Sequence, residues 1–107
     1  MKTIPLEGTD QQMVQVFKAL GHPARLKILR LLAERRACMC SEVVEELPLA
    51  QSTVSQHLKV LKDAGLIIGE IEGPAVCYCL APGALESLHH SVAQLSSETD
   101  QVDVCCK

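Results

Sequence analysis

Residues 47–67 read LPLAQSTVSQHLKVLKDAGLI, and this stretch decides the fold. At roughly 100° per residue in a helix, Val54, Leu58 and Leu61 fall on one face. Because that face is aliphatic, we expect it to pack into a core. Gly65 follows the apolar repeat directly and is typical of the residue that ends a helix. The stretch therefore predicts a helix that stops at this glycine, preceded by a short turn that contains a proline.

The other face of this predicted helix, residues 51–64, is polar and neutral to basic. The side chains opposite the aliphatic face or flanking it are Ser52, Thr53, Ser55, Gln56 and Lys59. Amide and hydroxyl groups can reach base edges in a DNA groove, and a lysine can meet a phosphate. An ordinary solvated helix face has the same composition, so both interpretations stay open for this helix taken alone.

The rest of the chain predicts further helices and one hairpin. We expect helices from a Thr9 cap to Leu20, from Pro23 to about Arg35, over about Ser41–Glu46, and from Ala81–Pro82 to about Leu95. The apolar stripe of the second of these is predicted at Leu26, Leu29, Leu32 and Ala33. Residues 66–72 and 75–80 predict two strands around a Gly73–Pro74 turn. This order is that of a mainly α, winged helix-turn-helix domain with a small β-hairpin, whose second paired helix enters a major groove.

Length and composition fit one small domain. The chain has 107 residues, of which 48% are hydrophobic, and its only aromatic residues are Phe17 and Tyr78. An aliphatic core of this kind suits packed helices better than a large sheet. We expect residues 1–97 to form the DNA-binding and dimerisation domain and residues 98–107 to form a flexible tail that carries cysteines.

The charge pattern bears on partners and compartment. A net charge of −3 argues against a uniformly basic protein that binds nucleic acid without specificity, but basic side chains gather between Lys18 and Arg36. That stretch can meet phosphates or can be a solvated helix face. No apolar run near the start resembles a signal peptide, and no segment approaches the length of a membrane span. The sequence therefore predicts a cytoplasmic protein with no membrane partner.

The six cysteines fall in three close pairs: Cys38 with Cys40, Cys77 with Cys79, and Cys105 with Cys106. In a reducing compartment such cysteines are thiols for metal binding or redox sensing rather than a disulfide framework. Cys77 and Cys79 alternate with Tyr78 in a predicted strand, so both point to one face. This pattern fits a pair of ligands or a pair of small buried side chains.

Three segments carry a resemblance to a known family: LGHPARLKILRLL, LPLAQSTVSQHLKVLKDAGLI and VCYCLAP. Over about residues 10–95 the chain resembles the ArsR/SmtB family of metal-responsive repressors. The resemblance implies that the helix after the turn is the recognition helix, that the hairpin is the wing, and that a homodimer forms through the first and last helices. It implies double-stranded operator DNA as the partner, contacted by Gln51, Ser52, Thr53, Ser55, Gln56, His57 and Lys59.

The sequence Cys38-Met39-Cys40-Ser41 lies where arsenic-responsive members carry Cys-Val-Cys-Asp at the start of the third helix. The resemblance implies arsenite or antimonite as the inducer, held by thiolates, which are soft ligands. The chain departs from the family because Glu42–Val44 occupies the place of the usual third cysteine. An extended tail of about eleven residues at roughly 3.3 Å each could reach about 35 Å. The predicted ligands are therefore Cys38, Cys40, Cys105 and Cys106.

Other functions are compatible with parts of this sequence. The same fold could sense cadmium, lead, mercury or zinc, or a redox or persulfide signal through a disulfide-forming pair. His89 and His90 lie where zinc-sensing relatives place ligands, but the rest of that pattern is missing, which favours exposed polar residues. His57 is better explained as a DNA or structural contact than as a metal ligand. No Cys-x-x-Cys and no nucleotide-binding loop is present, so we expect neither an enzyme nor a catalytic cofactor.

Overall fold

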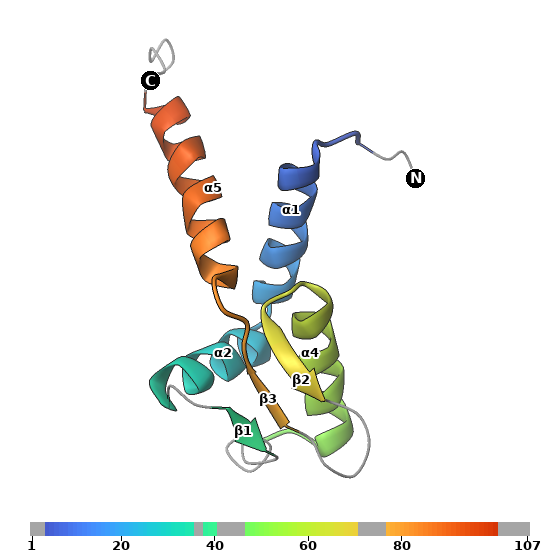
Figure 1. Ribbon diagram of the computed structural model, residues 1–107. Helices are drawn as coiled ribbons and strands as arrows, with labels where there is room; N and C mark the ends of the chain where they lie inside the picture. The colour runs from blue at the N-terminus through green and yellow to red at the C-terminus, as the bar shows by residue number, and fades with distance from the viewer. Residues whose placement is uncertain (1–3, 36–37, 41–46, 71–76, 101–107) are drawn as a thin grey trace, which may run out of the picture.

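The computed structural model describes residues 4–35, 38–40, 47–70 and 77–100 (Figure 1). Its elements are α1 (Gly8–Leu20), α2 (Pro23–Arg35), β1 (Met39–Cys40), α4 (Gln51–Asp63), β2 (Ile67–Glu70), β3 (Cys77–Leu80) and α5 (Ala84–Thr99). The predicted mainly α, winged helix-turn-helix fold is confirmed. The third helix, predicted over about Ser41–Glu46, lies outside the described residues.

The strands form one antiparallel sheet in the order β1-β3-β2. The hairpin of β2 and β3 is the predicted wing, with Ile67 opposite Leu80 and Glu70 opposite Cys77. Met39 and Cys40, expected only as the entry to that third helix, form the short strand β1 and extend the sheet beyond β3. A short extended segment can pair there because β3 has an open edge on that side.

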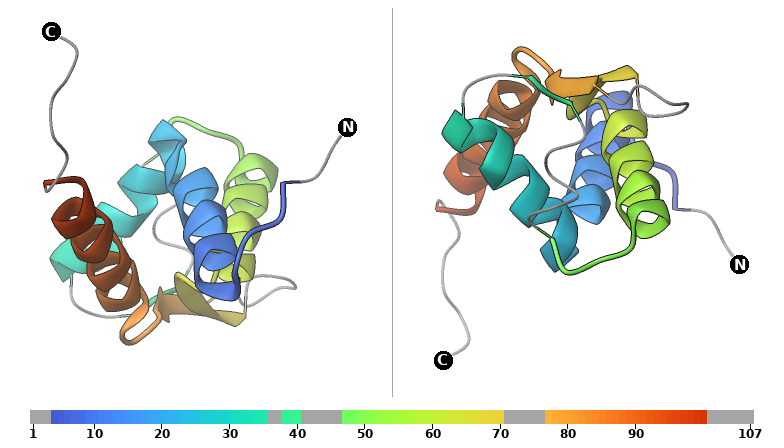
Figure 2. Two further views of the ribbon diagram at one scale, coloured as in Figure 1. Left: turned by 90° about the horizontal axis from the view of Figure 1, so that it is seen from above. Right: turned by 90° about the horizontal axis from the view of Figure 1, so that it is seen from below.

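A single aliphatic core joins the helices to the sheet. The buried side chains of this core come from all the elements except α5 and include Tyr78 and Met39, which are 0% and 2% exposed. On α4 the predicted core face is confirmed, since Val54, Leu58 and Leu61 are all at most 1% exposed. Figure 2 shows α1, α2 and α4 arranged around this core, with the sheet along one side.

The apolar stripe predicted for α2 is only partly correct. Leu29 and Leu32 are buried, but Leu26 is 43% exposed and Ala33 is exposed. The buried face also includes Ile28 and Leu31, so that it consists of Ile28, Leu29, Leu31 and Leu32. The reason is that α2 packs against three elements, α1, α4 and β3, so its buried face is broader than one stripe and turned around the helix.

Two helix boundaries also differ from expectation. The first helix begins at Gly8 after Glu7, with no side-chain cap, so Thr9 is not its N-cap. The last helix starts later than predicted, at Ala84 after a left-handed Gly83, and continues to Thr99 instead of stopping near Leu95. Thr99 Oγ1 donates a hydrogen bond to the Ser96 carbonyl at 3.0 Å, and no glycine or proline interrupts this last turn. Helix α5 therefore continues past residue 97, where the flexible tail was expected to begin.

The predicted end of α4 at Gly65 is confirmed, and its geometry aims the chain into the wing. Gly65 has φ +79°, and its N–H donates to the Lys62 carbonyl at 2.9 Å. The Leu66 N–H donates to the Leu61 carbonyl at 3.0 Å. This pair of bonds is the Schellman arrangement, which requires a left-handed residue and so favours glycine. It fixes the direction in which the chain leaves α4 and enters β2.

Candidate functional site

The polar face of α4 lies on the surface. Gln51, Ser52, Gln56 and Lys59 are exposed, and Thr53, Ser55 and His57 are half-buried beside them. The fully buried face described above holds the helix against the core, so the opposite side chains are presented to solvent on a rigid support. From the basic stretch, the exposed side chains are Lys18, Lys27, Arg30 and Arg35.

His57 is fixed by a contact with the start of α2. The imidazole rings of His57 and His22 have centroids 4.4 Å apart with a tilt of 48°. His22 is itself held, because its Nδ1 accepts a hydrogen bond from the Ala24 N–H at 3.1 Å. Partial burial lowers the pKa of His57, and the nearby His22 and Arg25 lower it further. A neutral His57 therefore packs α4 onto α2, which confirms a structural contact for this residue.

His22 was not predicted to matter, although a signal was present. It directly precedes Pro23, the first residue of α2. Proline is common at the first helical position, so the residue before it occupies the capping position. A histidine can accept a hydrogen bond from a helix N–H only through an unprotonated ring nitrogen.

The wing is tied to α4 at its outer strand. Lys62 Nζ donates a hydrogen bond to the Gly69 carbonyl at 2.8 Å. Gly69 has φ +130°, and a side chain there would place its Cβ only 2.7 Å from the Tyr78 Cα. Because that neighbour is backbone, no side-chain movement could relieve the contact. Glycine is thus required where β2 crosses closest to β3.

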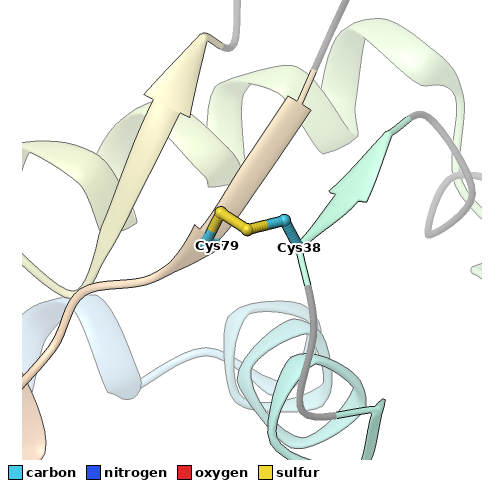
Figure 3. The surroundings of a disulfide bond; sticks show 2 residues. All are labelled: Cys38 and Cys79. Atoms are coloured by element: carbon cyan, nitrogen blue, oxygen red, sulfur yellow. A yellow bond between two sulfur atoms is a disulfide. The ribbon is translucent and has the colours of Figure 1, made fainter.

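Four cysteine positions meet on β1 and β3, and we call them the thiol cluster: Cys38, Cys40, Cys77 and Cys79. Cys38 and Cys79 form a disulfide across the two strands, with Cα atoms 4.2 Å apart although the residues are 41 apart in sequence (Figure 3). Cys77 is also disulfide-bonded. The backbone of Cys40 is in register with that of Cys77.

The two faces of this part of the sheet differ in chemistry. Tyr78 and Met39 are buried, whereas Cys38 and Cys77 are exposed and Cys79 is half-buried. This confirms that Cys77 and Cys79 share a face opposite Tyr78. The alternative of two small buried side chains is wrong for Cys77, because the inward face of β3 belongs to the tyrosine. The sulfurs described on these strands are therefore within reach of solvent.

The remaining ligand candidates are the two tail cysteines and the two histidines of α5, which the sequence pattern disfavours as ligands. Cys105 and Cys106 lie outside the described residues. His89 and His90 are exposed on α5, and not on the strands that carry the thiol cluster. Among the side chains that the structure describes, no group of three or more His, Cys, Asp or Glu residues is arranged to hold a metal ion.

A second surface combines α1 and α5, which lie next to each other and project from the body away from the sheet (Figure 1). We call it the α1–α5 face, and its exposed apolar side chains are Val14, Phe17, Leu85, Val92 and Leu95. None of the residues of α5 is buried. A hollow of about 910 Å³ runs between these helices and the end of α4. Within the described part of the chain, no helix is long and apolar enough to span a bilayer.

Known proteins share both the sequence and this arrangement. A helix-turn-helix domain model matches residues 20–70. An uncharacterised HTH-type transcriptional regulator of Methanocaldococcus jannaschii is 34% identical over 85 residues, which cover 79% of this chain and 96% of that protein. A transcriptional repressor SmtB homologue of Synechocystis sp. is 32% identical over 90 residues, covering 84% of this chain and 67% of that protein. The chain belongs to the ArsR/SmtB family of winged-helix transcriptional regulators.

The fold of this ArsR/SmtB regulator agrees with a solved relative. An ArsR-like transcriptional regulator from Rhodococcus sp. RHA1 superimposes with a TM-score of 0.74 and 25% identity, covering 89% of each chain. In this ArsR/SmtB regulator, α4 is thus the second helix of the helix-turn-helix and the β2–β3 hairpin is its wing. The relatives named here are regulators of transcription, a role that needs no catalytic residue.

Proposed function

We propose that this ArsR/SmtB regulator is a cytoplasmic homodimeric repressor that binds operator DNA through α4 and releases it when arsenite or antimonite binds its cysteine thiolates. The observation that carries the proposal is the thiol cluster beside the core that supports α4. Met39 and Tyr78 belong to the same buried core as Val54 and Leu58. A ligand bound to these sulfurs would therefore act on the direct neighbours of Met39 and Tyr78, whose side chains pack in the core that positions α4.

DNA binding is supported by the exposed face of α4. Gln56 and Ser52 offer amide and hydroxyl groups of the kind that read base edges, and Lys59 offers a cation for a phosphate. Gln51, Thr53 and Ser55 extend this surface toward the start of the helix. His57 contributes by holding α4 in place through His22.

The homodimer is supported by the α1–α5 face. A helix of 16 residues that buries none of them leaves its apolar side chains without a core. Large apolar patches on a soluble domain mark interaction surfaces. A second copy of the chain meeting this one across α1 and α5 would cover the patch and place two α4 helices on one duplex, as palindromic operators require.

The donor set fits a thiophilic inducer. Arsenite, As(OH)₃, exchanges its hydroxyl groups for thiols, so that three thiols yield three As–S bonds and release three waters. Cys38, just before β1, and Cys40 on β1 would supply two sulfurs, and Cys105 or Cys106 are candidates for the third. Sulfur ligands disfavour calcium, magnesium and manganese, which prefer oxygen.

The proposal is tested by titrating arsenite into the complex of reduced protein and operator DNA. Release requires that the ligand bind the DNA-free state more tightly, and DNA must then weaken arsenite binding by the same factor. We expect Cys38→Ser/Cys40→Ser to bind the operator normally and to lose release. A double variant that still dissociates with arsenite at the native concentration refutes the proposed ligands. Parallel titrations with cadmium, lead, mercury and zinc identify a different metal inducer.

The Cys38–Cys79 disulfide favours one second candidate, a repressor that responds to oxidants. A hydroperoxide would oxidise one thiol to a sulfenic acid with loss of an alcohol or water. The second thiol would then displace water to form the disulfide. Release of the operator by peroxide in the absence of arsenite, reversed by dithiothreitol, would identify this function.

A further inference from the structure

We propose that the wing strand β3 completes the inducer site, with Cys79 supplying the third sulfur beside Cys38 and Cys40. This inference rests on the proposed thiophilic inducer but adds a ligand on a different element. It also replaces the C-terminal tail as the source of that sulfur. The site then consists of sulfurs from two neighbouring strands rather than from one segment and a distant end.

The first argument is proximity. Cys38 and Cys79 are bonded, with Cα atoms 4.2 Å apart. Two sulfurs that can form a bond with each other can also contact one ion after that bond is reduced. No folding of the tail is needed, because the pairing of Met39 with Tyr78 already places the two strands together.

The second argument is the register of the sheet. Cys40 is opposite Cys77, and the bonded pair of Cys38 and Cys79 lies two positions along the same ladder. In an antiparallel pair, positions opposite each other share a face, and so do positions two apart on one strand. The four positions of the thiol cluster therefore form two rungs on one face of the sheet, on either side of the pair of Met39 and Tyr78.

The third argument is access. Cys38 is exposed and Cys79 is half-buried, whereas Tyr78 fills the opposite face of β3. An ion can reach these sulfurs from solvent without opening the core. By contrast, a ligand from the tail would have to be ordered when the ion binds, and that ordering opposes binding through lost conformational entropy. Preorganised sulfurs on paired strands avoid this loss.

The inference also provides a mechanical link. The hydrogen bond from Lys62 to Gly69 ties the wing to α4. An ion that clamps β3 to β1 would change how the wing strand packs on the core beneath it, and that change would reach α4 through the shared core.

Because three thiols are consumed for each arsenite, closure of the Cys38–Cys79 disulfide would block binding of the ion, and the bound ion would protect the thiols from oxidation.

Two matched double variants test the inference in the reduced, full-length chain. Cys77→Ser/Cys79→Ser removes the sulfurs of the wing, and Cys105→Ser/Cys106→Ser removes the same number from the tail. Arsenic X-ray absorption counts the sulfurs around the bound ion directly. We expect the tail variant to keep three sulfurs and native affinity. The wing variant should lose at least one sulfur, with a loss of affinity beyond the roughly 10- to 100-fold seen for groups that only support a ligand.

Single variants and a second probe complete the test. Cys77→Ser alone should keep three sulfurs, which assigns the ligand to Cys79. Circular dichroism of each variant shows whether it is folded. If arsenite fails to bind the native reduced chain, the proposed inducer is wrong. A cadmium–thiolate absorption that is lost only in the wing variant would still support the wing site. A wing variant that holds both ions with the native number of sulfurs overturns the inference.

Discussion

Removing the cross-link between β1 and β3 should lower the stability of the oxidised protein by an amount that the structure fixes. The Cys38–Cys79 bond joins residues 41 apart. For a loop of that length, the chain-entropy relation gives about 4 kcal/mol of stabilisation at about 25 °C. We therefore expect Cys38→Ser/Cys79→Ser, made in a Cys77→Ser background that removes the other disulfide-bonded cysteine of β3, to lose about 4 kcal/mol relative to that background under oxidising conditions. Serine replaces the sulfurs with little change in volume, so the effect should come from the lost loop closure.

Urea unfolding followed by circular dichroism measures this effect. With a urea m-value of about 1.5–2 kcal/mol/M for a chain of this size, the midpoint should fall by about 2–3 M. In dithiothreitol the Cys77→Ser protein and the variant made in it should unfold together, because neither then has the cross-link. Both proteins must be compared at equal concentration, since self-association changes apparent stability. Equal midpoints in the oxidised state would refute the reasoning, and a difference that persists in reductant would assign it to the substitutions themselves.

Four further predictions concern α4, the wing and the α1–α5 face. In competition binding, Gln56→Ala should lose about 1–3 kcal/mol of binding free energy for operator DNA but none for random DNA. Lys59→Ala should weaken binding to both DNAs and reduce the slope of log affinity against log salt by about one. An unchanged preference for the operator in Gln56→Ala contradicts base reading by that residue. Leu95→Glu should give monomers in sedimentation, because a charge replaces a 48% exposed apolar side chain of the proposed dimer surface. Gly69→Ala should lose about 1–3 kcal/mol or more in thermal unfolding because φ is +130°, and a native melting temperature would show that the strand adjusts freely. The pKa of His57 is lowered on folding from 6.5, so its contribution to stability is present above that pH and is lost as the pH falls below it. His57→Asn should flatten the stability profile below about pH 6.5, and an unchanged slope would exclude this group as its source.

The recognition helix and wing could be predicted because their signals are local. Val54, Leu58 and Leu61 recur at helical spacing, and Gly65 ends the helix by a conformation that few other residues adopt. The alternation of Cys77, Tyr78 and Cys79 likewise gave the correct faces of β3. In each case the decisive information lies within a few neighbouring residues.

The thiol cluster could not be predicted, because it depends on pairing between distant segments. β1 has only two residues, Met39 and Cys40, which is too short for any periodic pattern. Nothing in the sequence near Cys38 indicates a partner 41 residues away. The buried face of α2 was missed for a related reason, since neighbours on two sides of that helix decide which side chains are covered.

The absence of any buried residue on α5 has a consequence for how much of this protein must be present. In the proposed homodimer α5 would cover its apolar side chains against a second copy, so its stability would depend on protein concentration. At low protein concentration, monomers would predominate, and each would carry a single α4 for DNA and an α5 without a second copy to pack against. The level at which the protein is synthesised would then set a threshold for occupancy of its operator before any inducer is present. Loss of α5 contacts would also expose the apolar end to proteases, so excess single chains would be removed faster than assembled ones.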